Sequence, residues 1–258
     1  MRLESGLADF RSLLGVTGFF DARAGQYDRL RPQTEAWWGR FHALVEYGDL
    51  HGRRVLDVGC GTGAVAAALA EHASSKVWGL EPSEAMLAVA RDRVPASVGL
   101  KRGVAEALPF RDAWFDRIVM CLVVHLVDRP RALAEAHRVL VPQGRIAIAT
   151  FDHSHFDGYW ASRFFPSLAD VDRTRFPAVG VLSGELERAG FDTPTVVPLH
   201  AAETFDRDVA LERLRGGHIS TFSLLDPDEV ADGIARAERE LPRTVRSELL
   251  QAVVVASR

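Results

Sequence analysis

Residues 54–63 of this 258-residue chain read RVLDVGCGTG, and this stretch decides the fold. Its first half, which contains the apolar VLDV, predicts a short buried strand. Its second half alternates one acidic residue with three glycines, at Asp57, Gly59, Gly61 and Gly63. The alanine-rich residues 64–70 (AVAAALA) then favour a helix. The stretch therefore predicts a strand, a tight glycine turn and a helix in direct succession.

This glycine turn has two interpretations. Glycines let the chain fold tightly, and they let a ligand approach the backbone because no Cβ stands in the way. The free amides at the start of the following helix also suit an anion. However, glycine turns are common in α/β folds, so a second observation is needed before the turn indicates a binding site.

A second strand supplies that observation. Residues 76–80 (KVWGL) read as a buried strand, and Glu81 stands at its end, 24 positions after Asp57. In dinucleotide-binding folds a ribose-binding acid follows the glycine turn by about 20 residues. Ser83 is a suitable N-cap for the helix that comes next. We therefore expect Glu81 to accept hydrogen bonds from an unmodified ribose rather than to be an ordinary acid at a strand end.

Beyond the turn, four stretches in order within residues 20–151 resemble the class I S-adenosylmethionine-dependent methyltransferases of the broad small-molecule, type 11-like family. They are VLDVGCGTG, GLEPSEAML, GVAEALPFRDAWFDRIV and HRVLVPQGRIAIATF. Rossmann dehydrogenases are the nearest competitor, but Gly63 falls one position too early for the third glycine of their G-x-G-x-x-G fingerprint. A nicotinamide-dependent oxidoreductase and a non-catalytic cofactor-binding module remain the alternative functions.

The resemblance implies a cofactor, S-adenosyl-L-methionine, and in-line methyl transfer to an O, N, S or C atom of a small-molecule acceptor. Relatives often carry an Asp before the Ala-Glu pair of the adenine loop, where this chain has Val104. Adenine recognition would then use the backbone of Ala105 or Glu106, or the Glu106 side chain. The residues implied to bind the cofactor are Tyr27, Asp57, Gly59, Cys60, Gly61, Gly63, Glu81, Pro82, Met86, Ala105 and Glu106.

Two residues are candidates for a catalytic role. His125 directly follows the predicted fourth strand, at a position that in relatives borders the transferred methyl group. It is a candidate general base if the acceptor must lose a proton, and its alternative role is that of a hydrogen-bonded histidine at a strand end. Tyr27 lies in a segment that in relatives folds over the methionine end of the cofactor, where it would orient the ligands or simply pack against the core.

The alternation of strands and helices predicts an α/β fold with a doubly wound, mostly parallel, seven-stranded Rossmann-like sheet. Helices are expected on both faces, with a small helical addition near the C-terminus. We expect one methyltransferase domain over residues 1–258, with a helical cap at residues 1–50. Residues 152–180 and 206–245 are expected to be insertions that form the acceptor pocket. Because ligands bind beyond the carboxyl ends of parallel strands, one site can collect Gly59, Glu81, Ala105 and His125.

Composition narrows the remaining classes of function. The net charge of -4, without a strongly basic block, argues against nucleic acid as a partner. No apolar run approaches the roughly 20 residues of a membrane helix, and residues 1–15 lack the apolar stretch of a signal peptide. The only cysteines, Cys60 and Cys121, cannot build a disulfide framework, and the pair His153 and His155 lacks further metal ligands. These features predict a cytoplasmic protein without a metal site. They leave the oligomeric state open, and we expect a monomer or a homodimer.

Overall fold

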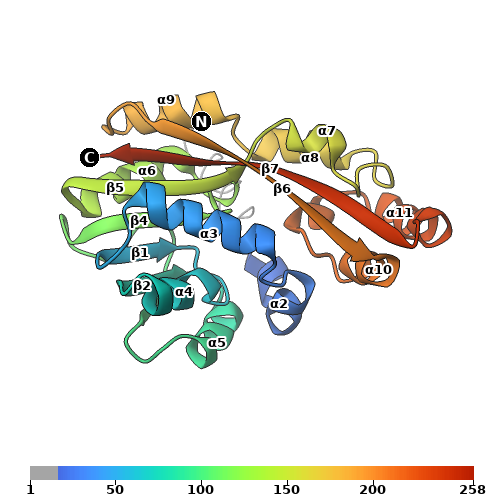
Figure 1. The fold of residues 1–258 in the computed structure, drawn as a ribbon, viewed down its shortest axis with the longest axis horizontal. Helices are drawn as coiled ribbons and strands as arrows, with labels where there is room; N and C mark the ends of the chain where they lie inside the picture. The colour runs from blue at the N-terminus through green and yellow to red at the C-terminus, as the bar shows by residue number, and fades with distance from the viewer. Residues whose placement is uncertain (1–16) are drawn as a thin grey trace, which may run out of the picture.

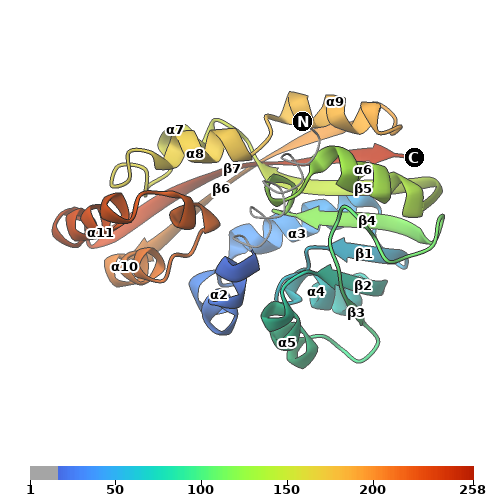
Figure 2. The same ribbon diagram turned by 180° about the vertical axis from the view of Figure 1, so that it is seen from behind.

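The computed structural model describes residues 17–258, and its centre is a seven-stranded sheet with the strand order β3-β2-β1-β4-β5-β7-β6 (Figures 1 and 2). The first five of these strands pair in parallel, while β7 runs antiparallel to both of its neighbours. The mostly parallel, doubly wound sheet predicted from the sequence is therefore confirmed. Residues 1–16, which belong to the predicted cap, lie outside the described part of the chain.

Strands and helices alternate through most of the chain. The strands are β1 (Arg54–Val58), β2 (Lys76–Glu81), β3 (Gly99–Arg102), β4 (Phe115–Cys121), β5 (Leu140–Phe151), β6 (Thr195–Asp206) and β7 (Thr244–Ser257). The α-helices are α2 (Tyr27–Leu30), α3 (Glu35–Gly48), α4 (Ala64–His72), α5 (Glu84–Arg93), α6 (Arg129–Val139), α7 (His155–Gly158), α8 (Leu168–Arg175), α9 (Val179–Arg188), α10 (Arg207–Arg215) and α11 (Pro227–Glu240). Three short 3-10 helices are η1 (Ala24–Gln26), η2 (Val124–Leu126) and η3 (Ser220–Leu224).

Alternate residues of the central strands bury their side chains in two cores on opposite faces of the sheet. Leu56 of β1 and Ile118 of β4 pack with α6 and α9, whereas Val55 and Val119 pack with α3 and α4. Figures 1 and 2 show these two layers of helices from opposite sides. Because both faces are covered, the central strands are apolar almost throughout.

A third core lies beside the sheet, on the long ribbon made by β6 and β7. These strands pair over the whole length of β6, but β5 joins β7 only from Gln251 onward. The free half of the ribbon carries α10 and α11, and α7 and α8 lie against it (Figure 1). Large apolar side chains from residues 152–180, such as Phe164 and Phe165, pack there against Leu211 and Leu214 of α10. The two segments expected to be insertions thus meet in one helical subdomain, and the helical addition near the C-terminus is confirmed.

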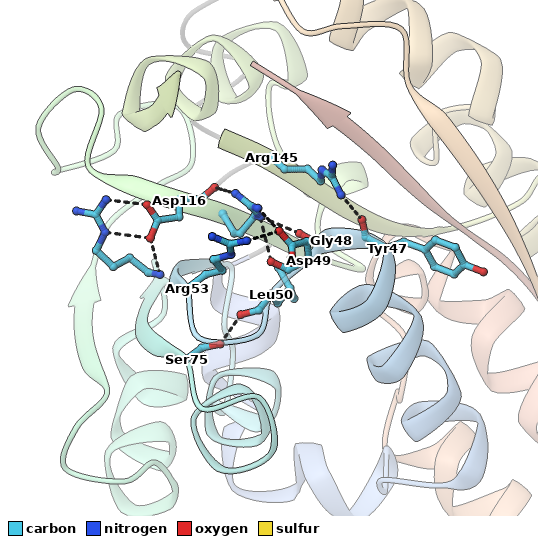
Figure 3. A network of polar contacts seen from close by, with 10 residues as sticks. Tyr47, Gly48, Asp49, Leu50, Arg53, Ser75, Asp116 and Arg145 are labelled. Carbon is cyan, nitrogen blue, oxygen red and sulfur yellow. Dashed lines mark hydrogen bonds and ion pairs between the residues drawn. The ribbon is translucent and has the colours of Figure 1, made fainter. Parts of the chain in front are cut away.

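A polar network ties α3 to the amino ends of β1 and β4 (Figure 3). The buried Arg117 guanidinium donates to the carbonyl oxygens of Gly48 and Asp49 and forms an ion pair with the Asp49 carboxylate. The Arg54 guanidinium donates two hydrogen bonds to the Asp116 carboxylate, from Nη2 to Oδ1 over 2.7 Å and from Nε to Oδ2 over 3.0 Å. This network lies at the end of the strands away from the glycine turn, so it supports the sheet without contacting the candidate site.

The glycine turn that follows β1 requires left-handed backbone at Gly59 (φ +71°), Gly61 (φ +55°) and Gly63 (φ +79°). L-residues adopt this conformation at a cost, which explains why glycine alternates through the turn. No helix within residues 17–258 is both long and apolar enough to span a membrane.

Candidate functional site

Three adjoining cavities lie beyond the carboxyl ends of β1, β2 and β4. We call them the glycine cleft, between the glycine turn and η2; the arginine cleft, between the glycine turn and α3; and the aromatic chamber, between η2 and the helical subdomain. Tyr27 and Leu122 line all three, so the cavities meet at these two side chains. This is the edge of the sheet at which open α/β folds bind ligands.

The glycine cleft brings together most of the residues that the sequence implied for the cofactor. Its walls include Tyr27, Gly59, Gly61, Glu81, Pro82, Met86, Ala105 and Glu106. Gly63 lines none of the three cavities and instead is the N-cap residue of α4. The part that Gly63 plays is therefore to shape the turn, because its backbone amide donates to the Cys60 carbonyl over 2.8 Å.

Glu81 is held at the floor of the glycine cleft by two backbone amides. Its Oε2 accepts from the amide of Gly61 and its Oε1 from the amide of Ser83, each over 3.0 Å. Burial raises the pKa of this carboxyl, while the two amide hydrogen bonds oppose that shift. A carboxylate offers about four lone-pair sites, so Glu81 keeps acceptor capacity for a ligand.

The adenine loop is anchored through Glu106. Its Oε1 accepts a hydrogen bond of 2.8 Å from the amide of Asp128, the N-cap residue of α6. One carboxylate oxygen of Glu106 is therefore engaged, and the other accepts no hydrogen bond from residues 17–258. Ala105 and Met86 are buried at the same wall, with 6% and 1% of their surface exposed.

The arginine cleft is lined by Asp57 and Cys60 on one side and by Arg31 and Arg40 on the other. Asp57 is 1% exposed, and its Oδ2 has no hydrogen-bond partner in the described part of the chain. Burial, reinforced by the neighbouring Glu81 charge, raises the pKa of Asp57 to about 7. A buried carboxylate with an unused oxygen is suited to a cationic group of a ligand.

Helix α2 places Tyr27 at the junction of the cavities. Asp28 fixes this helix to the glycine turn because its carboxylate accepts from Thr62 Oγ1 over 2.8 Å and pairs with Arg93. The Tyr27 hydroxyl accepts from Arg31 Nη1 over 3.1 Å. Within residues 17–258 the Tyr27 hydroxyl donates to no protein acceptor, so its proton is left for a ligand.

His125 lies in the aromatic chamber, on η2 just after β4. Its ring stacks on Phe176 with 3.8 Å between centroids, and its Nδ1 is buried without a hydrogen-bond partner in the described residues. Burial, aided by Arg175 and Arg31, lowers the pKa of His125 well below its usual range. The imidazole is therefore neutral near pH 7, with a ring nitrogen able to accept a proton.

The chamber also contains functional groups that the sequence did not single out. Asp172 of α8 and Thr221 of η3 line the chamber, and Thr221 donates to Asp172. Arg175, which does not line it, lies 3.6 Å from Asp172. Tyr159 and His218 form a further hydrogen-bonded pair. The high aromatic content of residues 152–176 was the sequence signal that could have indicated Tyr159 and Asp172. No local pattern marks His218, because it reaches the chamber only through the packing of the helical subdomain.

The chain is similar in sequence to proteins of known family. The chain is 31% identical to a demethylmenaquinone methyltransferase from Renibacterium salmoninarum over 217 residues, which cover 80% of this chain and 89% of the relative. The chain belongs to the class I S-adenosylmethionine-dependent methyltransferases. The family described as a methyltransferase domain matches residues 56–148 of this methyltransferase chain. The family expected from the sequence is thus confirmed.

This methyltransferase is also similar to a second curated relative and to a solved structure. It is 46% identical to the methyltransferase GfsG of Streptomyces halstedii over 178 residues, which cover 62% of this chain and 61% of that relative. Several other curated relatives are likewise matched over less than two thirds of their length. A putative methyltransferase from an antibiotic biosynthesis pathway of Anabaena variabilis shares its fold, with a TM-score of 0.67, 23% identity and coverage of 84% of this chain and 96% of the other.

Proposed function

We propose that this protein transfers a methyl group from S-adenosylmethionine to a small-molecule acceptor. The observation that carries the proposal is the continuity of the three cavities, which meet at Tyr27 and Leu122. A nucleoside in the glycine cleft and an acceptor in the aromatic chamber would face each other across these two side chains. Holding two reactants in such an arrangement, away from water, accounts for much of the catalysis that a transfer of this kind needs.

The residues present fit the cofactor. Glu81 has acceptor capacity left for the ribose hydroxyls, and the unpartnered Oδ2 of Asp57 suits the ammonium of the methionine part. Arg40, whose Nη1 donates to Gln251 over 3.3 Å, is available for the carboxylate. When bound, S-adenosylmethionine supplies an electrophilic methyl group on a sulfonium. Gly59, Gly61, Pro82, Met86, Ala105 and Glu106 would form the walls around the nucleoside.

In the acceptor site, His125 and Tyr27 would have different roles. The neutral His125 ring would accept the proton of a hydroxyl or amine acceptor. Tyr27 would donate its hydroxyl proton to orient a ligand at the junction. Residues 152–180 and 206–245 would supply the chamber walls that select the acceptor. A cytoplasmic location and a monomer or homodimer are part of the same proposal.

Calorimetry with S-adenosylhomocysteine and, separately, with NAD tests the cofactor. We expect binding of S-adenosylhomocysteine at micromolar concentration and no binding of NAD. The reverse result would favour a nicotinamide-dependent oxidoreductase. Incubation with S-adenosylmethionine labelled in its methyl group and a metabolite extract then tests turnover. A labelled small molecule is expected, whereas cofactor binding without any labelled product would indicate a non-catalytic binding module.

A further inference from the structure

Two pairs of stacked rings line the aromatic chamber. His125 stacks on Phe176 with 3.8 Å between ring centroids, and His155 stacks on Phe151 with 4.3 Å. Burial lowers the pKa of His155 to about 4, so this second imidazole is also neutral near pH 7. Neutral, stacked rings offer a planar apolar surface, to which another planar ring binds by offset stacking. The rings that line the chamber therefore favour a ligand that carries a planar ring.

The charges in the chamber disfavour a cationic ligand. Its two lining carboxylates are already opposed by arginines, since Asp172 lies 3.6 Å from Arg175 and Glu203 lies 3.7 Å from Arg213. Within residues 17–258, Arg31 lines the chamber without a carboxylate in ion-pair distance. An ammonium ligand would thus meet an uncompensated guanidinium and would find no free carboxylate.

A chain of hydrogen bonds through His218 determines where the Tyr159 hydroxyl donates its proton. The Arg213 carbonyl can only accept, so the 3.0 Å contact with His218 requires a proton on His218 Nδ1. Burial, with the charges of Arg31 and Arg213, lowers the pKa of His218 to about 3, so the ring carries only that proton. His218 Nε2 therefore accepts, and the Tyr159 hydroxyl donates to it over 2.8 Å. The Tyr159 oxygen can then only accept hydrogen bonds, from the Trp160 side chain and from a ligand in the chamber.

We propose that Tyr159 selects a planar acceptor with a neutral hydroxyl, of the phenol or enol class, by accepting a hydrogen bond from that hydroxyl, which is not the atom that is methylated. This inference rests on the proposed methyltransferase function. Tyr159 is a specificity-determining residue, and His218 positions it. A molecule of the same shape with a methoxy group in place of the hydroxyl offers only an acceptor, which would face the acceptor lone pairs of Tyr159.

Three ligands with the same two rings test this selection by calorimetry at pH 7.5, with the protein saturated with S-adenosylhomocysteine. They are 2-naphthol, 2-methoxynaphthalene and 2-naphthylmethylamine, the last of which is an ammonium ion at this pH. We expect 2-naphthol to bind about tenfold more tightly than 2-methoxynaphthalene, as one hydrogen bond predicts. We expect the ammonium to bind most weakly. Equal binding of the first two, tightest binding of the ammonium, or no binding of any ligand would overturn the proposal.

Two variants assign the preference to Tyr159. Tyr159→Phe should reduce the ratio of the two affinities to less than about twofold, with 2-methoxynaphthalene binding unchanged. Tyr47→Phe removes the same hydroxyl from an exposed residue of α3, and it should keep the wild-type ratio. If Tyr159→Phe also keeps that ratio, the proposal is wrong. If Tyr159 had a purely structural role, Tyr159→Phe would instead lower the affinity for both ligands equally.

His218→Phe gives a second, independent measurement if Tyr159→Phe does not fold. This change removes the acceptor of the Tyr159 proton, so the hydroxyl becomes free to donate to a methoxy oxygen. The ratio should then fall through tighter binding of 2-methoxynaphthalene, and an unchanged ratio would contradict the inference. If the wild type does not bind S-adenosylhomocysteine, the proposed function is contradicted instead. Failure of the proposed function is therefore distinguishable from failure of the inference about Tyr159.

Discussion

The three glycines of the turn differ in what a side chain would meet at each position. A Cβ on Gly59 would lie 2.5 Å from a methyl group of Val123, and one on Gly63 would lie 2.8 Å from Val94. A Cβ on Gly61 would have nothing within 4 Å and would point into open space at the clefts. The sequence shows three equivalent glycines, but the structure divides them into two where a Cβ would clash with neighbouring side chains and one where it would not.

Replacement of Gly61 by alanine should therefore impair binding more than folding. We expect Gly61→Ala to weaken S-adenosylhomocysteine binding at least tenfold, while left-handed strain costs about 1–2 kcal/mol of stability. Gly59→Ala adds a steric clash to the same strain and should cost about 2–5 kcal/mol. Urea unfolding and calorimetry on both variants check this. Equal losses of stability, with binding intact in folded Gly61→Ala, would show that Gly61 is only a structural residue.

The carboxyl of Asp57 should make cofactor binding depend on pH. Because its pKa is raised to about 7 in the free protein, Asp57 becomes protonated as pH falls below 7 and can no longer pair with an ammonium. The affinity for S-adenosylhomocysteine should therefore rise from pH 5.5 to pH 7.5, by up to about tenfold per pH unit below 7. Calorimetry across this range measures it.

Two controls assign this pH dependence to Asp57. 5′-Methylthioadenosine has the same nucleoside without the ammonium, so its affinity should hardly change over the same range. Asp57→Asn should bind S-adenosylhomocysteine weakly at every pH in that range. A similar slope for both nucleosides would mean that another group titrates.

His125 should determine the chemical step if the acceptor must lose a proton. We expect His125→Asn to lower the single-turnover rate by about 10²–10⁴-fold, because asparagine cannot act as a base. Since the His125 pKa is lowered, the wild-type rate should be constant from pH 6 to pH 8 and fall only at lower pH. His200→Asn, at an exposed histidine of β6, is the control. A normal rate in His125→Asn would leave proximity as the source of catalysis.

Among the elements, β1 and β4 depend on polar contacts at their amino ends as well as on their apolar faces. Arg54 and Arg117 stand on these two strands, and their partners Asp116 and Asp49 complete the network of Figure 3. Hydrogen bonds from Arg54 hold the pKa of Asp116 below its usual range. For Asp49, burial would raise the pKa, but the contacts with Arg117 and Arg53 outweigh it and lower it.

The contribution of Asp116 to stability should therefore disappear in acid. A carboxyl whose pKa is lowered by folding stabilises the protein above its unfolded-state pKa, about 3.9, and loses this contribution as pH falls through the folded-state value. We expect Asp116→Asn to cost about 1–2 kcal/mol at pH 7, because the side chain is partly exposed. Near pH 2 it should cost almost nothing.

Urea unfolding of this variant at both pH values measures the difference. Asp170→Asn breaks an ion pair whose carboxylate is 85% exposed, and it should change stability by less than about 0.5 kcal/mol at either pH. A loss of stability in Asp116→Asn that is equally large in acid would contradict the electrostatic explanation.

On the scale of the whole molecule, the protein joins a sheet with two cores to a helical subdomain with its own core. Arginines of the N-terminal segment span the two parts. Arg23 Nε donates to the Gly216 carbonyl over 3.1 Å, and Arg31 Nε donates to the His218 carbonyl over 2.5 Å. The segment that carries Tyr27 is thereby fixed to the helical subdomain by Arg23 and Arg31, while Asp28 between them fixes it to the glycine turn.

Replacing each of two helix glycines by alanine distinguishes the effect of packing in the subdomain from the effect of helix propensity. Gly39 of α3 is exposed, with nothing within 4 Å of a new Cβ, so Gly39→Ala should stabilise the protein by about 0.5–1 kcal/mol. A Cβ on Gly233 of α11 would lie 2.3 Å from the Phe165 ring and 2.8 Å from the Phe164 carbonyl oxygen. Gly233→Ala should therefore destabilise by about 1–3 kcal/mol despite the same gain in propensity.

The same variant tests the division of the molecule into parts. Hydrogen exchange in Gly233→Ala should increase at α10 and α11 but not at β1 and β4, because those elements belong to different cores. Binding of S-adenosylhomocysteine should persist. Faster exchange throughout the sheet would mean that the protein unfolds as a single unit.

The sequence by itself determined the sheet, the turn and the ribose-binding candidate. The glycine turn, Glu81 at a strand end and the alternating helices are local patterns, and local patterns fix local backbone conformation. The tertiary structure alone decided what the chamber contains. Tyr159, Asp172 and His218 meet there because the β6–β7 ribbon brings residues 152–180 and 206–245 onto one core. Contacts between residues so far apart in the chain arise from packing, which no periodicity in one segment encodes.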